Sequence, residues 1–319
     1  MDTGAYAKQL NQEIIIMRSM EHSNIIRLLD CLHDEANVYL VMELCVGGVI
    51  TDFIAGSGFF SELQASIVMK QILSAVHYIH ETHGICHRDL KPANFLFLTK
   101  DPIETNVVRL IDFGLAARVE GQEMLRSRTG TMAFMAPQVM NGNQYDKEAD
   151  LWSCGVIMYI LLCGYAPFAA KTTLGLEKKV ARGNFAFDEE WESVSDDAKD
   201  LVKKLLTMNP NERLSAEGAL KHTWISQGAP NAPRAALSRG VLSNLQRFAV
   251  SSRVTAVNPP PKQKESSWLS SLFVDLIMPI CCVSSKECHG VAVDEVYVYS
   301  PRTFGFGRFP NAADGERLQ

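Results

Sequence analysis

Apolar runs with the character of β-strands all lie before residue 112, whereas helical spacing of apolar residues dominates from Asp150 to Ile225. Helical spacing also occurs at residues 5–20 and 62–80. Because strands and helices do not alternate regularly, we expect an α+β fold rather than a repeating βαβ sheet. The strand-like runs are short and occupy residues 25–32, 37–44, 95–98 and 107–111.

The composition is that of an ordinary globular chain. Its 319 residues are 47% hydrophobic and 21% charged, which excludes collagen, coiled coil and wholesale disorder. The formal net charge of -5 argues against a dedicated nucleic-acid-binding protein, which needs a broad basic face. The eight cysteines form no CxxC pair and show no zinc-finger spacing with histidines, so we expect reduced thiols.

The amino terminus carries no recognisable targeting signal. Residues 1–4 have neither the basic and apolar regions of a signal peptide nor a glycine at position 2. We therefore expect a cytoplasmic protein. The apolar run at 154–163 is about half of the ~20 residues that a membrane span requires, so we interpret it as a buried core helix.

Two polar motifs lie after or between short strand-like segments. The first is His87-Arg88-Asp89-Leu90-Lys91-Pro92-Ala93-Asn94, and the second, Asp112-Phe113-Gly114, begins 23 residues after Asp89. Either motif alone is more often a feature of packing or of surface pairing. Together, in this order, they resemble the catalytic loop and the metal-binding turn of eukaryotic protein kinases. The resemblance extends from about Ala7 to Ile225.

The resemblance implies transfer of the γ-phosphate of ATP, with Mg²⁺, to a hydroxyl group of a protein substrate. Such catalysis rests on aligning the hydroxyl with the phosphate and on neutralising charge. Asp89 would accept the hydroxyl proton, and Lys91 would lie beside the transferring phosphate. Asn94 and Asp112 would hold the metal ions through hard oxygen ligands. Lys91 together with Thr131 is similar to the pattern of serine/threonine kinases rather than tyrosine kinases.

The same resemblance assigns residues to a nucleotide pocket. Glu13 matches the glutamate of helix C, which forms an ion pair in the family. Met42, Glu43 and Cys45 fall in the hinge that binds adenine, with Met42 as the gatekeeper. Leu96 would form the floor of the adenine pocket.

Other matches concern the support of the site. Asp150 resembles the aspartate of helix F that braces the backbone of the catalytic loop. His87 and Phe113 resemble members of the hydrophobic spine that stacks when the site is assembled. Gln138 stands where the family has a glutamate that forms an ion pair with the equivalent of Arg213. We therefore expect a hydrogen bond between Gln138 and Arg213 that is weaker than this ion pair.

The implied fold is kinase-like, with an incomplete small β lobe and a mainly helical C-lobe. Residues 1–45 would form the partial N-lobe with helix C and the following strands, and residues 46–226 the C-lobe. Residues 227–256 would form an amphipathic helix like an autoinhibitory junction. Eight of the thirteen prolines lie between 230 and 319, so residues 257–319 are expected to be a largely disordered tail with an apolar helix at 267–280.

The chain departs from the family in front of Glu13. It contains no G-x-G-x-x-G motif, and Lys8 would lie on helix C itself, so no upstream lysine can orient the α- and β-phosphates. Glu13 should therefore lack the lysine with which it would form an ion pair, and the α- and β-phosphates of ATP would lose one positively charged partner. The alternative to an active kinase is a non-catalytic kinase-like binding module, either a pseudokinase or a truncated gene product.

Within the kinases, the chain is most similar to the calcium/calmodulin-dependent group, above all to plant and protist calcium-dependent protein kinases. The stretches 164–168, 197–201 and 222–225 carry this likeness. No EF-hand loop is present, so a calcium response would come from calmodulin or another calcium sensor bound at 234–253. The alternative for this basic amphipathic segment is a helix that caps the C-lobe.

Two features remain, one in the substrate site and one in the tail. Val49 and Ala93 stand where basophilic kinases carry acids, so we do not predict a strict Arg-x-x-Ser preference. Residues 267–282 combine an apolar helical pattern with Cys281-Cys282. Membrane docking and a partner-binding or autoinhibitory helix are the alternatives, and the scarcity of basic residues nearby favours the second.

Overall fold

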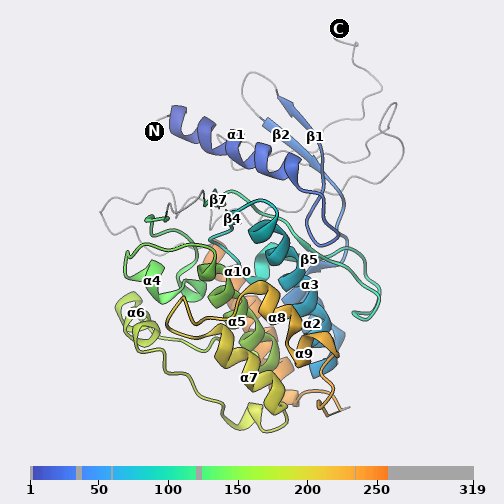
Figure 1. Ribbon diagram of the computed structural model, residues 1–319. Coiled ribbons are helices and arrows are strands. Elements are labelled where there is room, and N and C mark those ends of the chain that lie inside the picture. The colour runs from blue at the N-terminus through green and yellow to red at the C-terminus, as the bar shows by residue number, and fades with distance from the viewer. Residues whose placement is uncertain (1–2, 34–37, 59, 120–123, 234, 258–319) are drawn as a thin grey trace.

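The computed structural model describes residues 3–33, 38–58, 60–119, 124–233 and 235–257, which form a small and a large part (Figure 1). The small part contains α1 (Thr3–Ser19) and the antiparallel strands β1 (Leu28–His33) and β2 (Val38–Met42). The large part is mainly helical and lies on one side of them. This arrangement confirms the predicted α+β class, with few strands and a helical larger lobe.

The remaining elements follow in the order expected from the sequence, and 3₁₀ helices are labelled η. After β2 come β3 (Gly48–Val49), α2 (Ile50–Ser57), α3 (Glu62–Glu81), β4 (Ile85–Cys86), η1 (Pro92–Asn94), β5 (Phe95–Phe97), β6 (Val108–Leu110) and β7 (Ala117–Arg118). Then follow η2 (Met132–Phe134), α4 (Pro137–Met140), α5 (Glu148–Cys163), α6 (Thr173–Arg182), η3 (Glu189–Trp191), α7 (Asp196–Leu205), α8 (Ala216–Lys221), α9 (Thr223–Ser226) and α10 (Arg239–Val257). Helix α2 was not predicted, because it is only eight residues long and directly follows β3.

The β5–β6 pair brings the two polar motifs of the sequence together. The strands are antiparallel, with Phe95 opposite Leu110, and β3 pairs with the other edge of β5. Asn94 precedes β5 and Ile111 follows β6, and the Ile111 N–H donates to the Asn94 carbonyl at 3.1 Å. The same strand β6 holds the small part, since the Ile26 N–H donates to the carbonyl of Leu110 at 2.9 Å.

Helix α5 forms the centre of the large part. It is buried from Ala149 to Cys163, which confirms the predicted core helix, and α3, α7 and α10 pack against it. Apolar side chains on all faces are expected for a helix that is enclosed by others. Among the described residues, no helix is both long and apolar enough to cross a bilayer.

The buried Arg213 has the neutral partner that the sequence predicted. Its Nη2 atom donates to Gln138 Oε1 at 3.3 Å, a long hydrogen bond, and the guanidinium also donates to the carbonyls of Thr207 and Glu148. Burial of the charged group lowers the pKa of Arg213 to about 10, while the nearby Asp146 opposes this shift. The weaker hydrogen bond expected at this position is therefore confirmed.

Helix α10 is docked on the large part. It begins at Arg239, twelve residues later than the predicted segment 227–256 begins, and it packs against α2 and α5. Val241 and Leu245 are fully buried there. The docking requires a glycine at 164, because a Cβ atom at that position would lie 2.6 Å from the carbonyl oxygen of Val241. The apolar segment 267–280 and the rest of residues 258–319 lie outside the described residues.

Candidate active site

Asp89 lies at the centre of a compact polar cluster. Its Oδ1 atom accepts hydrogen bonds from the backbone N–H of Thr131 at 2.8 Å and from the Thr131 hydroxyl at 2.7 Å. Its Oδ2 atom accepts one from Lys91 Nζ at 2.7 Å, and Lys91 Nζ also lies 3.3 Å from the Thr131 hydroxyl oxygen. Asp89 is only 7% exposed, so its carboxylate is held in one orientation by partners on both oxygens.

Asn94 and Asp112 lie next to this cluster on the two adjacent loops. Asn94 Nδ2 donates to the carbonyl of Asp89 at 2.9 Å, which leaves the amide oxygen of Asn94 without a hydrogen bond among the described residues. Asp112 Oδ1 accepts from the backbone N–H of Gly114 at 2.9 Å. An amide oxygen and a carboxylate on neighbouring loops are suitable ligands for Mg²⁺, which binds through few protein oxygens and completes its coordination with phosphate and water.

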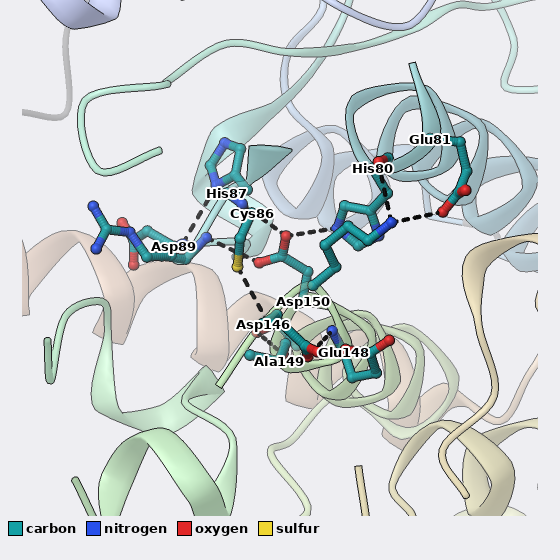
Figure 2. A network of polar contacts seen from close by, with 12 residues as sticks. His80, Glu81, Cys86, His87, Asp89, Asp146, Glu148, Ala149 and Asp150 are labelled. Carbon is teal, nitrogen blue, oxygen red and sulfur yellow. Dashed lines mark hydrogen bonds and ion pairs between the residues drawn. The ribbon is translucent and has the colours of Figure 1, made fainter. Parts of the chain in front are cut away.

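The buried Asp150 holds the backbone of the catalytic loop. Its Oδ2 atom accepts hydrogen bonds from the His87 N–H at 2.7 Å and from His80 Nε2 at 2.8 Å, and its Oδ1 atom accepts from the Arg88 N–H at 2.9 Å (Figure 2). Burial alone would raise the pKa of the Asp150 carboxyl, but the hydrogen bond and charge of His80, together with His87, hold it below its ordinary value. The predicted bracing role thus has a direct structural basis.

Gly130 allows Thr131 to reach Asp89. The φ angle of Gly130 is +114°, and a Cβ atom there would overlap the carbonyl oxygen of Arg88. Arg88 itself has a φ angle of 71°, a left-handed conformation that costs energy for a residue with a side chain. The hydrogen bonds that Asp150 accepts from the backbone N–H groups of His87 and Arg88 therefore hold this strained turn in place. Gly130 packs directly on the turn.

Helix α1 contacts the loop that carries Asp112, but its Glu13 side chain forms no ion pair among the described residues. Gln9 Nε2 donates to the carbonyl of Gly114 at 2.8 Å, so α1 is fixed to the loop that carries Asp112. Glu13 on the same helix has no cationic partner among the described residues. Burial and the negative charge of Asp112 together raise the pKa of Glu13 to about 8.

The residues assigned to the adenine pocket lie near the junction of the two parts. Met42 ends β2 and is buried, Cys45 is buried three residues later, and Leu96 is fully buried in the middle strand of the β3–β5–β6 sheet. Glu43 forms a two-pronged ion pair with Arg109, with N–O distances of 2.8 and 3.0 Å. Any contact of Glu43 with a ligand would therefore come from its main chain. The nucleotide roles of these residues remain predictions.

Sequence reasoning missed two residues of the site. His80 orients the Asp150 carboxylate from α3, and Arg109 neutralises Glu43 from β6. A histidine on the apolar face of a helix is more often part of the core, so His80 gave no signal. The expected packing of His87 on Phe113 is present, with ring centroids 5.3 Å apart.

A family comparison agrees with this geometry. The family model described as the protein kinase domain matches residues 2–225, which is most of the chain. The chain belongs to the protein kinase family. Protein kinases use ATP and Mg²⁺, and the positions of Asp89, Asn94 and Asp112 on adjoining loops are compatible with that chemistry.

The kinases to which the chain is similar include calcium-dependent protein kinases of protists and plants, the group that the sequence predicted. The chain is 46% identical over 225 residues to calcium-dependent protein kinase 5 of Plasmodium falciparum, which covers 70% of this chain and 39% of that protein. It is 42% identical over 254 residues to calcium-dependent protein kinase 8 of Arabidopsis thaliana, which covers 79% and 47%. The predicted likeness to protist and plant calcium-dependent kinases is thereby confirmed. The chain spans less than half of the length of these two relatives.

Proposed function

We propose that this chain transfers the γ-phosphate of ATP to serine or threonine hydroxyls of protein substrates. The observation that carries the proposal is the Asp89 carboxylate, which is oriented by Lys91 and Thr131 beside Asn94 and Asp112. When bound, ATP supplies the phosphoryl group and Mg²⁺ neutralises its charge. Asn94 and Asp112 would hold the metal through their side-chain oxygens.

The protein's own part in this reaction is positioning and proton acceptance. A substrate hydroxyl that approaches Asp89 Oδ2 could give its proton to the carboxylate as the oxygen attacks the γ-phosphorus and the bond from that phosphorus to the leaving ADP breaks. Lys91 Nζ is already 2.7 Å from that oxygen, so its positive charge would lie next to the transferred group. The Asp150 hydrogen bonds fix the backbone of the loop, which would reduce the entropy lost when a substrate is aligned.

A second candidate is a non-catalytic kinase-like module that binds partners through its large lobe. Glu13 favours this candidate, because its carboxyl group has no cationic partner among the described residues and its pKa is raised to about 8. A site without such an ion pair is less well arranged for the α- and β-phosphates of ATP than one in which the glutamate pairs with a lysine.

Replacement of Asp89 by asparagine separates the two candidates. We expect the full chain to transfer ³²P from labelled ATP to a mixture of serine and threonine peptides, and Asp89→Asn to lower the rate roughly 100-fold or more, because the proton acceptor is lost. Asp196→Asn is the matched control, since the Asp196 side chain is fully exposed. Absence of transfer by the unaltered chain, with normal thermal stability, would contradict the kinase proposal and support the binding module.

We also infer that calmodulin or another calcium sensor binds residues 234–253. The named calcium-dependent relatives support this, as do apolar residues at helical spacing among arginines. Because Val241 and Leu245 are buried, the sensor would have to displace α10. In calorimetric titrations with calcium-loaded calmodulin, Gly164→Ala should bind more tightly than Gly58→Ala, where a Cβ meets nothing within 4 Å. Equal calmodulin affinities of the two variants, or binding that does not depend on calcium, would exclude displacement of α10 by a calcium sensor.

Two predictions concern where the chain resides in the cell. A cytoplasmic location stays a prediction, and a membrane contact through 267–282 stays the alternative that we do not favour; that segment falls outside the described residues. Flotation of the full chain with neutral and anionic liposomes tests them together. Co-flotation that is lost when 267–282 is deleted would establish the membrane contact, and its absence would exclude it.

A further inference from the structure

A surface rich in positive charge adjoins Asp89. We call it the basic surface; it consists of residues 125–131 and of residues 171–182, which include α6. Arg128 on the first segment pairs with Glu177 on the second, so the two segments are in contact. Glu177 is the one acidic residue in these two segments, whose cations are Arg126, Arg128, Lys171, Lys178, Lys179 and Arg182.

The arginines of the basic surface lie only a few residues before Thr131, which contacts Asp89. Thr131 hydrogen-bonds to Asp89 through both its backbone and its hydroxyl. Arg128 is three residues before Thr131 and Arg126 is five before it, so their backbones lie at most about 11 Å and about 18 Å away. An extended substrate with its hydroxyl at Asp89 covers the same distances in three to five residues.

The charge of this surface is only partly neutralised internally, by the Arg128–Glu177 pair. The Arg126 guanidinium has no carboxylate within salt-bridge distance among the described residues; its neighbour is the neutral amide of Gln144, which can accept from Nη2 at 2.6 Å. Arg88, directly before Asp89, donates to the carbonyl of Leu115 and to the hydroxyl of Ser127, both of which are uncharged. Arg128 is 44% exposed despite its ion pair, so a substrate can reach it.

Val49 and Ala93 offer no negative charge to a basic substrate. Val49 in β3 and Ala93 in η1 are half-buried, and β3 packs against η1. These two apolar side chains would meet a substrate arginine without a compensating charge, and desolvating a guanidinium in that way is unfavourable. The two regions therefore differ in charge, because Val49 and Ala93 are apolar, whereas Arg126 and Arg128 are exposed cations and only Arg128 is paired among the described residues, with Glu177.

On the basis of the kinase function proposed above, we propose that this chain selects substrates with aspartate or glutamate three to five residues from the phosphorylated hydroxyl. Arg126 and Arg128 are the specificity-determining residues, and the acidic side chain lies over the basic surface. Opposite charges across a partly exposed contact accelerate association and exclude substrates of the wrong sign. The preference should weaken as ionic strength rises, because exposed charges more than about 8 Å apart are screened at 0.15 M salt.

A peptide series tests the proposal with two readouts. Peptides with one central serine carry aspartate, alanine or arginine at each position from five before to five after it. Fluorescence anisotropy measures their affinity for the full chain, and ³²P transfer measures KM and kcat. We expect acidic residues at one or two positions to improve affinity and KM roughly three- to tenfold over alanine, with arginine weaker than alanine there and kcat little changed.

Charge-reversal variants identify the residues responsible. Arg126→Glu should abolish or invert the acidic preference in both readouts, and Arg128→Glu should do the same at a position nearer the serine. Lys100→Glu is the control, because Lys100 is exposed on the loop between β5 and β6. This substitution changes the net charge by the same amount as Arg126→Glu or Arg128→Glu. Its peptide preference should match that of the unaltered chain.

The outcomes separate this inference from the proposed function. Phosphorylation without an acidic preference, or an acidic preference that survives both reversals, would overturn the inference and leave the kinase function standing. Acidic selectivity in the anisotropy readout without any phosphate transfer would support the basic surface as a peptide site while it contradicts the kinase function. A preference for arginine three residues before the serine would refute the inference directly.

Discussion

Asp150→Asn should destabilise the protein by about 3–5 kcal/mol, because one partner of a buried charged network is removed while the others remain. The carboxylate accepts from His80, His87 and Arg88 and is 1% exposed. An amide of the same size has one oxygen, and its NH₂ group would face a donor. Denaturant unfolding followed by circular dichroism measures the loss, which is a large part of the 5–15 kcal/mol that domains typically have.

The pH dependence of this loss provides an internal check. The pKa of Asp150 is lowered in the folded protein, so ionisation of this group favours folding above its ordinary pKa of 3.8, and the benefit disappears as pH falls through the lower folded value. The difference in unfolding free energy between the two proteins should therefore be constant from pH 7 to about pH 5 and shrink below pH 3.8. A difference that does not depend on pH, or one no larger than that of Asp196→Asn, would argue against the bracing role.

Gly130→Ala should abolish phosphate transfer, with a loss of roughly 100-fold or more, because the added methyl group overlaps the carbonyl of Arg88 and must displace Thr131 from Asp89. Gly142→Ala is a closely matched control. Gly142 also has a positive φ angle, +71°, but a Cβ atom there has nothing within 4 Å. The control should pay only the conformational cost of about 1–2 kcal/mol and keep its activity.

Transfer rates at saturating ATP and peptide, measured with thermal melting curves, distinguish the two glycine variants. If both lose the same stability and the same activity, the effect arises from backbone strain alone. Loss of activity confined to Gly130→Ala, at comparable melting temperature, would show that the position of Thr131 matters for catalysis. Retention of full activity by Gly130→Ala would contradict the proposed arrangement of Asp89 and Thr131.

The local character of a segment could be predicted from the chain alone. Helix α3 was predicted close to its observed bounds and α5 only in its apolar part, residues 154–163, because hydrophobic spacing depends on neighbours in sequence. Two short strands were predicted near β5 and β6, and their pairing in the structure makes the loops at Asn94 and Asp112 adjacent. The central acidic and amide residues of the site were identified in the sequence through the resemblance of their motifs to those of kinases.

Partners distant in sequence could not be predicted in the same way. His80 and Asp150 are 70 residues apart, and Glu43 and Arg109 are 66 apart, so no periodic pattern relates them. The docking of α10 depends likewise on the absence of a side chain at Gly164, which sequence spacing does not reveal. Such contacts depend on how whole elements pack, and many side-chain pairings are compatible with one hydrophobic pattern.

The sequence alone established the kinase motifs and the α+β class. Folding added the environment of each group: a shift of the Glu13 pKa to about 8, the hydrogen bonds that hold Arg88 at a φ angle of 71°, and the ion pair that joins Arg128 to Glu177 on α6. The reason is physical. Motifs and periodicity are properties of neighbouring residues, whereas burial and electrostatic potential are sums over groups that only tertiary packing brings together.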